Sequence, residues 1–319
     1  MKERTVYWNG ALIPESEARV SIYDSALMFG DTIFEMTRSF NKRHFMLKEH
    51  LERLHRSAKY INMPFPLSVE ELISAVGEVT EANSNAFGPD DEHRIMINIT
   101  RGLLPIYEFS GVNIPPGPNV IIANYPLKWT VQAIGHLFSE GIDAVIPSQR
   151  AIPARLLESK IKNRSRIHYL KANLEISKME GKNNWALLLD EDGFVTEGIG
   201  SNFFIVKGGA LVTPEPRNIL RGISREYVIG LSNELNVPVV ERNIEVYDIM
   251  EADEAFMTAT PFCMLPVTSI EGKKIGSGRR GTYFNMILNK WSQNVGVDIE
   301  AQILEWQTES VNPYDAGKQ

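Results

Sequence analysis

The sequence contains very little cysteine, because Cys263 is the single one among 319 residues. An intrachain disulfide is therefore excluded, and a reducing compartment such as the cytoplasm is expected. Cys263 lies in an apolar stretch, 259–267, so we expect it to be buried rather than to act as a nucleophile. One cysteine cannot form a structural zinc site, and the six histidines show no metal-ligand spacing, so no metal is predicted.

Long apolar runs and an excess of positive charge are also absent. No window reaches the length of a membrane-spanning helix, and residues 1–19 contain no apolar run of signal-peptide length. The formal net charge of −7 argues against nucleic-acid binding, which needs a basic surface. Hydrophobic residues make up 43% of the chain, enough for a sizeable core. We expect a cytoplasmic protein that binds neither nucleic acid nor membranes.

The pattern of apolar residues predicts a mixed α and β fold in two unequal halves. Asn9-Gly10 predicts a hairpin, and Ser68 with Glu71 forms a capping-box motif at the start of a helix. We place the junction near 126–130, which gives domains 1–126 and 127–319. Helices are expected at 49–62, 68–82, 130–140, 169–180, 224–236 and 282–295. Strands are expected at 5–8, 11–13, 36–40, 44–47, 93–100, 119–124, 142–146, 185–190, 203–206, 210–213, 237–241, 254–258 and 264–270.

The basic segment 160–166 contains two lysines that differ in their surroundings. A lysine that attacks an aldehyde must first lose a proton, so it needs a fixed and partly desolvated position. Lys162 follows Ile161 and can end a short buried strand, whereas Lys160 follows Glu158 and Ser159 and is expected at the surface. On composition alone the segment is also compatible with an ordinary solvated loop.

Four further positions could bind an anion, although each has an ordinary structural explanation as well. Ser224 is expected as the N-cap of a helix that begins after Gly222, and helix N-termini suit phosphate. Thr260 ends a strand and carries a hydroxyl. Arg53 lies beside the apolar face of the helix at 49–62. Arg101 lies where a strand meets a loop, a suitable place to hold a carboxylate.

The order of these motifs resembles that of the class IV aminotransferases, the fold type IV enzymes that use pyridoxal 5'-phosphate (PLP). The similarity extends from about residue 20 to about residue 290 and includes branched-chain and D-amino-acid aminotransferases and aminodeoxychorismate lyase. The matching segments are 29–35 with Arg38, 49–54 with 57–58, Lys162 with 169–170, 192–193 with 196–198 and 201–204, 213–214 with 220–225, 252–254 with 258–260, and 276–281.

The resemblance implies a role for each matching residue. Lys162 would hold the cofactor covalently, with Lys160 as the alternative, and Glu197 would pair with the ring nitrogen. Tyr169 would bond to the ring hydroxyl, and the phosphate would bind Arg53, Ile223, Ser224 and Thr260. The substrate side would include Phe34, Arg38, Arg101 and Ala259.

The resemblance also implies an α+β (mixed α/β) protein with a smaller N-terminal α/β domain and a larger C-terminal pseudo-barrel domain. The expected reaction moves an amino group between a branched-chain or D-amino acid and a 2-oxo acid, and a homodimer is expected. The alternatives are a lyase that releases pyruvate and a ligand-binding relative without turnover. One departure is that the segment between Lys162 and Tyr169 is longer than in typical branched-chain enzymes and carries Arg164 and Arg166.

Overall fold

The computed structural model describes residues 3–108 and 117–307, and its chain forms two compact units. Unit 1 comprises Met1–Trp129 with Ile161–Arg166, and unit 2 comprises Thr130–Lys160 with Ile167–Gln319. The sequence-based junction lay nearby, but it assigned 161–166 to the second half. The six residues that carry Lys162 instead lie in unit 1.

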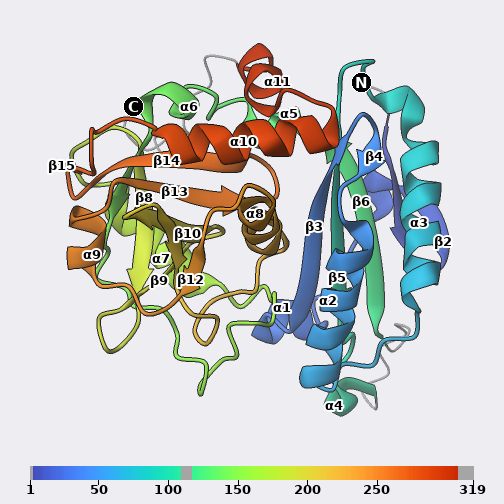
Figure 1. The fold of residues 1–319 in the computed structure, drawn as a ribbon. Helices are drawn as coiled ribbons and strands as arrows, with labels where there is room; N and C mark the ends of the chain where they lie inside the picture. The colour runs from blue at the N-terminus through green and yellow to red at the C-terminus, as the bar shows by residue number, and fades with distance from the viewer. Residues whose placement is uncertain (1–2, 109–116, 308–319) are drawn as a thin grey trace. The chain divides into compact units, whose positions relative to one another are not determined.

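Unit 1 is built on an antiparallel sheet that has six strands in the described part of the chain (Figure 1). The strand order is β2-β1-β6-β5-β3-β4. The strands are β1 (Thr5–Trp8), β2 (Ala11–Pro14), β3 (Thr32–Phe40), β4 (Arg43–His44), β5 (His93–Thr100) and β6 (Asn119–Pro126). The helices are η1 (Glu15–Glu17), α1 (Ser25–Phe29), α2 (Leu47–Tyr60), α3 (Val69–Ala82), η2 (Ser84–Ala86) and α4 (Pro105–Glu108).

Helices α2 and α3 cover one face of this sheet, and the core of unit 1 lies beneath them (Figure 1). Leu51 and Leu54 of α2 are almost fully buried against Ile97 of β5 and its neighbours, as the helical periodicity predicts. Truncating such a leucine to alanine typically costs about 2–5 kcal/mol. Ile161 belongs to the same core, which explains why its short segment belongs to unit 1.

Unit 2 contains a sheet that has nine strands in the described residues. Its strands are β7 (Ile142–Val145), β8 (Asn184–Leu189), β9 (Val195–Gly198), β10 (Asn202–Lys207), β11 (Ala210–Thr213), β12 (Val239–Glu241), β13 (Glu254–Ala259), β14 (Cys263–Ile270) and β15 (Lys273–Lys274). Its helices are α6 (Leu137–Glu140), α7 (Ile167–Ile176), α8 (Ile223–Glu234), α9 (Val246–Met250), α10 (Thr282–Val295) and α11 (Ile299–Glu305). Helix α5 (Lys128–Val131) crosses the boundary between the units.

The sheet of unit 2 curls into a pseudo-barrel. Along the order β10-β13-β14-β7-β8-β9, each strand pairs with the next, and β9 pairs back onto β10 through Glu197 and Asn202. This closure brings together polar residues from neighbouring strands. The expected mixed α and β fold, with a pseudo-barrel in the C-terminal half, is confirmed.

Two sequence-based elements are wrong. The helix expected at 130–140 is interrupted, and only short α5 and α6 form on either side of the turns at 132–136. The strand expected at 44–47 ends early, because Met46 has the left-handed φ of 48° and is the N-cap of α2. The short helices η1, α1, η2, α4, α9 and α11 were not expected.

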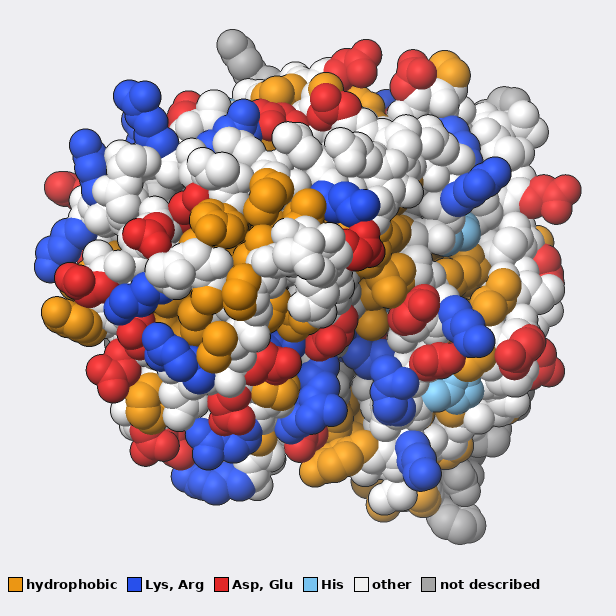
Figure 2. Space-filling model, viewed as in Figure 1, with side chains coloured by type: hydrophobic (Ala, Val, Ile, Leu, Met, Phe, Trp, Pro, Cys, Tyr) orange, Lys and Arg blue, Asp and Glu red, His pale blue; other side chains and the backbone are white. Residues whose placement is uncertain are grey.

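The surface carries both signs of charge, as Figure 2 shows for one face of the protein. Exposed ion pairs such as Arg155 with Glu191 and Arg56 with Glu52 contribute little stability because water screens them. Within residues 3–108 and 117–307, no helix combines the length and apolar character that crossing a membrane requires.

Candidate active site

Lys162 lies on a short segment that pairs with β3. Its carbonyl oxygen accepts a hydrogen bond from Phe34 N at 2.9 Å, and Arg164 N donates to Thr32 O at 2.9 Å. An isolated bridge joins Asn163 to Ile33, so the segment is shorter than the strand expected from the sequence. The Lys162 side chain is half-buried, and its Nζ lies 4.9 Å from the centre of the Phe34 ring.

Lys160 has different surroundings in unit 2. Its Nζ forms an ion pair of 2.6 Å with Glu158 and donates to Arg217 O at 3.1 Å. An amine that a carboxylate and a carbonyl oxygen already hold is not free to attack an aldehyde. The structure therefore favours Lys162 over Lys160 as the reactive lysine.

Arg53 takes part in a buried network in unit 1. Its Nε donates to Glu35 Oε1 at 2.6 Å and its Nη2 to Glu35 Oε2 at 2.8 Å, a bidentate ion pair. His50 Nδ1 lies 2.7 Å from Glu35 Oε2. Burial by itself would raise the pKa of Glu35, but Arg53 and His50 lower it far below its ordinary value. The carboxylate is therefore ionised and holds Arg53 in one orientation.

The same network fixes the protonation of His50. An ionised carboxylate only accepts hydrogen bonds, so Nδ1 of His50 must carry the proton that is shared with Glu35. Burial lowers the pKa of His50, which keeps the ring neutral at pH 7 and leaves a lone pair on Nε2. Within the described chain, this Nε2 is buried and has no hydrogen-bond partner.

Glu197 is held by three donors in unit 2. Tyr169 Oη donates to its Oε1 at 3.1 Å, while Asn202 Nδ2 and Leu220 N each donate to its Oε2 at 3.0 Å. The residue is buried and lies within β9. Gly222 leaves room for Asn202, because a Cβ atom there would lie 2.1 Å from Asn202 Oδ1. This arrangement fixes a carboxylate in a defined position.

The residues expected at the phosphate meet at the start of α8. Gly222, not Ser224, is the N-cap, and no side chain caps the helix. Ile223 and Ser224 are therefore the first two helical residues, whose N–H groups have no acceptor within the helix. Ser224 Oγ lies 3.5 Å from Thr260 Oγ1, which follows Ala259 at the end of β13. The hydroxyls of Ser224 and Thr260 therefore lie close together at the N-terminus of α8.

Two of the expected substrate residues lie on the face of β3 opposite α2. Phe34 and Arg38 are both almost fully buried. Arg38 Nε donates to Ser39 O at 3.2 Å, and its guanidinium lies 3.8 Å from the centre of the Phe40 ring.

Arg101, the arginine expected to hold a substrate carboxylate, is engaged within unit 1. Its Nε donates to Asp31 Oδ2 at 2.6 Å, and its Nη1 and Nη2 donate to the carbonyl oxygens of Asn62 and Ile61 at 2.9 and 3.1 Å. A substrate carboxylate would have to displace Asp31, so the role predicted for Arg101 requires this ion pair to open.

Comparison with known proteins decides the family. The model of the amino-transferase class IV family matches residues 32–270. The chain belongs to the class IV aminotransferases. It is 31% identical over 288 residues to the branched-chain-amino-acid aminotransferase of Escherichia coli (strain K12), covering 86% of this chain and 88% of the relative. It is 31% identical over 278 residues to the D-alanine aminotransferase of Bacillus licheniformis, covering 86% and 92%.

A solved structure agrees with this assignment. The T.th. branched-chain amino acid aminotransferase with pyridoxamine 5'-phosphate has a TM-score of 0.78 and 29% identity, covering 93% of this chain and 95% of that chain. Fold type IV is thereby confirmed. The family depends on PLP, so this protein is a PLP-dependent aminotransferase.

The described residues fit this cofactor. The hydroxyls of Ser224 and Thr260 at the start of α8 suit a phosphate group, and the fixed Glu197 carboxylate suits a protonated ring nitrogen. In unit 1, Arg53 is buried and held in one orientation by Glu35, which suits a donor to the phosphate group.

Sequence reasoning missed the residues that orient the expected ones. Glu35, His50 and Asn202 had no role assigned to them, although all three lie in the matching segments. Glu35 and Arg53 carry opposite charges on a strand and on the helix that follows it. This combination could have suggested that the two side chains form an ion pair. The pairing of Asn202 with Glu197 depends on closure of the pseudo-barrel and has no local signal.

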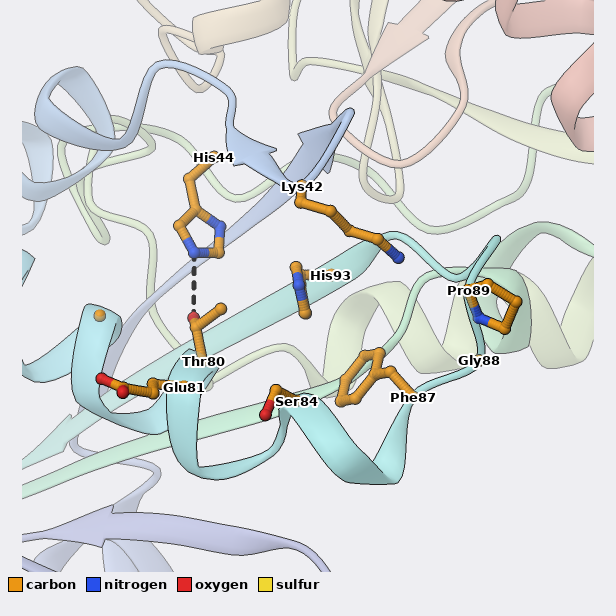
Figure 3. A pocket seen from close by; sticks show the side chains of 10 residues that line it. Lys42, His44, Thr80, Glu81, Ser84, Phe87, Gly88, Pro89 and His93 are labelled. Atoms are coloured by element: carbon orange, nitrogen blue, oxygen red, sulfur yellow. Dashed lines mark hydrogen bonds between the residues drawn. The ribbon is translucent and has the colours of Figure 1, made fainter.

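A pocket of about 600 Å³ lies elsewhere in unit 1, between β4, α3 and the start of β5. Figure 3 shows His44 reaching Thr80, with His93 and Phe87 beside it, and the His44 Nε2 to Thr80 Oγ1 distance is 3.0 Å. Burial, followed by the charge of His93, lowers the pKa of His44 to about 4, so its ring is neutral at pH 7. None of the expected site residues lines this pocket.

Proposed function

We propose that Lys162 holds PLP covalently and that Glu197 keeps a proton on the ring nitrogen. The observation that carries this proposal is the fixed and buried Glu197 carboxylate, held by Tyr169, Asn202 and Leu220. The ion pair that holds Lys160 to Glu158 argues against the alternative lysine. Arg53, Ile223, Ser224 and Thr260 are proposed to bind the phosphate.

Each proposed residue has a chemical task. Bound PLP supplies an electron sink for the bonding electrons of the substrate α-carbon. Glu197 strengthens that sink by stabilising a positive charge on the ring nitrogen. With PLP bound, Lys162 Nζ would accept the proton from the substrate α-carbon and give it up again. The phosphate-binding residues keep the ring in one position during both transfers.

We propose a branched-chain or D-amino acid as the amino donor and a 2-oxo acid as the acceptor, because the branched-chain and D-alanine relatives act on these classes. Phe34, Arg38 and Ala259 are proposed to contact the substrate, and Arg101 stays a prediction that requires Asp31 to move. Both relatives are aminotransferases, which supports transamination over release of pyruvate by a lyase.

A panel of D- and L-amino donors tests this function, with and without a 2-oxo acid. Sustained turnover is expected only when both substrates are present, because an amino group taken from the donor must be passed to an oxo acid before the enzyme can act again. The measurement is product formation by the protein loaded with PLP. Pyruvate formation from aminodeoxychorismate without an acceptor would favour the lyase, and a protein that takes up no PLP would favour the non-catalytic alternative.

We also propose a homodimer that uses the apolar surface around α1. Val20, Ile22, Leu27, Met28 and Phe29 are all exposed, although they follow one another closely in the sequence. Several exposed apolar side chains within one short segment are typical of an interface with another chain. Light scattering should give the mass of a dimer for the wild type and a lower mass for Leu27→Asp, and a monomeric wild type would exclude the dimer. The cytoplasmic location stays a prediction.

A further inference from the structure

The pocket between β4, α3 and the start of β5 contains two histidines and an aromatic ring side by side. Its volume of about 600 Å³ is within the range of small-molecule sites. The ring centres of His44 and His93 are 5.8 Å apart, and Phe87 lies 4.7 Å from the His93 ring. Figure 3 shows His93 between His44 and Phe87. The hydrogen-bonding state of the two histidines therefore decides what the pocket can hold.

His44 presents an unpaired acceptor in this pocket. Thr80 Oγ1 donates its proton to Val76 O at 2.7 Å, so it can only accept from His44 Nε2, which lies 3.0 Å away. The proton of the neutral ring is therefore on Nε2, and Nδ1 keeps its lone pair. In Figure 3 this Nδ1 lies on the side of the ring that faces Lys42 and His93. It has no donor among the residues that the structure describes, and such an unpaired buried acceptor is costly.

His93 presents the complementary donor. Asn124 Nδ2 donates to His93 Nδ1 at 3.2 Å, so the ring proton is on Nε2. Burial is the main cause that lowers the pKa of His93, and the ring is neutral at pH 7. No acceptor in the described part of the chain pairs with Nε2. At neutral pH the pocket thus offers one free acceptor and one free donor on neighbouring rings.

The charge of the lining residues favours a neutral ligand. Lys42 and Glu81 are exposed and opposite in sign, and both histidines are neutral. A carboxylate offers only acceptors and an ammonium group only donors, so neither can pair with both ring nitrogens. A cyclic amide carries an N–H and a C=O side by side and can pair with both. Its flat ring can also pack against Phe87.

We propose that this pocket binds a free lactam ring of the kind found in nucleobases. The ring N–H would donate to His44 Nδ1, the neighbouring C=O would accept from His93 Nε2, and the ring would contact Phe87. The site is separate from the proposed cofactor and substrate residues, none of which lines the pocket. The inference therefore does not depend on the proposed function.

Binding of uracil and of 1,3-dimethyluracil to the PLP-loaded protein tests this assignment. Dimethylation removes both N–H donors of uracil and keeps its ring and its carbonyl groups. The histidine ring signals in an NMR titration report the place of binding, and those of His44 and His93 are identified by their loss in His44→Phe and His93→Phe. Uracil should shift both signals and should bind about 10-fold more tightly than 1,3-dimethyluracil, because only uracil can donate to His44.

Gly77→Leu should block the pocket. Gly77 lies on α3 within the lining, and a Cβ atom added there meets no atom within 4 Å, so the larger side chain can enter the open space without a clash. The dissociation constant of uracil should rise by at least about 10-fold. Gly230→Leu is the matched control, because Gly230 lies on α8, has the same open space and is not part of the lining. It should leave the dissociation constant unchanged, and both variants should take up PLP as the wild type does.

Three results would each overturn the proposal. The first is a wild type that binds no uracil or shows no shift of the His44 and His93 signals. The second is equal binding of the two pyrimidines, and the third is wild-type uracil binding in Gly77→Leu. Should a histidine variant fail to fold, the comparison of Gly77→Leu with Gly230→Leu still decides whether this pocket is the site.

Discussion

Replacing Lys162 by alanine should reduce transaminase turnover by about 10⁴-fold, because both covalent attachment of the cofactor and proton transfer at the α-carbon are lost. PLP should still bind, since the phosphate and ring-nitrogen contacts belong to other residues, but borohydride should no longer fix it to the protein. The measurements are single-turnover kinetics and peptide mapping after borohydride reduction. In the wild type, the label should be on Lys162.

The matched control for this prediction is Lys160→Ala. Lys160 lies two residues away and is paired with Glu158, so its loss should change turnover by less than about 3-fold. An added primary amine should restore part of the activity of Lys162→Ala by acting as the proton carrier. A borohydride label on Lys160, or full activity of Lys162→Ala, would refute the assignment.

Glu35→Gln should lower the free energy of unfolding by about 3–5 kcal/mol, because it leaves the buried Arg53 guanidinium without its counter-charge. The amide side chain preserves the size of Glu35, so the effect measures charge rather than a cavity. Urea-induced unfolding of the PLP-free protein, followed by circular dichroism, measures it.

Glu52→Gln is the control on the same helix, α2, since Glu52 forms an exposed pair of 3.9 Å with Arg56. Its effect on the free energy of unfolding should be below about 1 kcal/mol.

The free energy of unfolding of wild type and of Glu35→Gln should also depend differently on pH. The pKa of Glu35 is lowered by folding, so its contribution is present above the unfolded value of 4.5 and is lost as the pH falls below it. The gap between wild type and Glu35→Gln should therefore narrow below pH 4.5, and a gap independent of pH would argue against an ionised Glu35.

Most of the regular structure could be predicted from the sequence, because local patterns determine it. The hairpin at Asn9-Gly10, the capping box of Ser68 and the helix Thr282–Val295 all follow from turn, cap and periodicity signals, and the structure confirms them. The errors arose near the ends of elements, where periodicity is a weak signal. The strand expected at 44–47 ends early, because Met46 has a left-handed φ and is the N-cap of α2.

The site shows the same division. The expected residues could be named because their motifs follow one another in a recognisable order. Their orientation could not, because it depends on partners that the sequence separates: Glu35 holds Arg53, and Asn202 holds Glu197 only after the pseudo-barrel closes. The pocket of His44 and His93 had no local signal either, because the two histidines come together only when β3 pairs with both β4 and β5.

Unit 1 is formed by two separate segments of the chain, and this affects when it can fold during synthesis. Unit 1 takes in Ile161–Arg166, so its core lacks Ile161 until the ribosome has synthesised those residues, which follow 31 residues of unit 2, Thr130–Lys160. A gene fragment that ends at Trp129 would therefore encode a sheet without the strand-pairing segment and without the lysine. Any attempt to split or permute this aminotransferase should keep the link between β3 and Ile161–Arg166 intact.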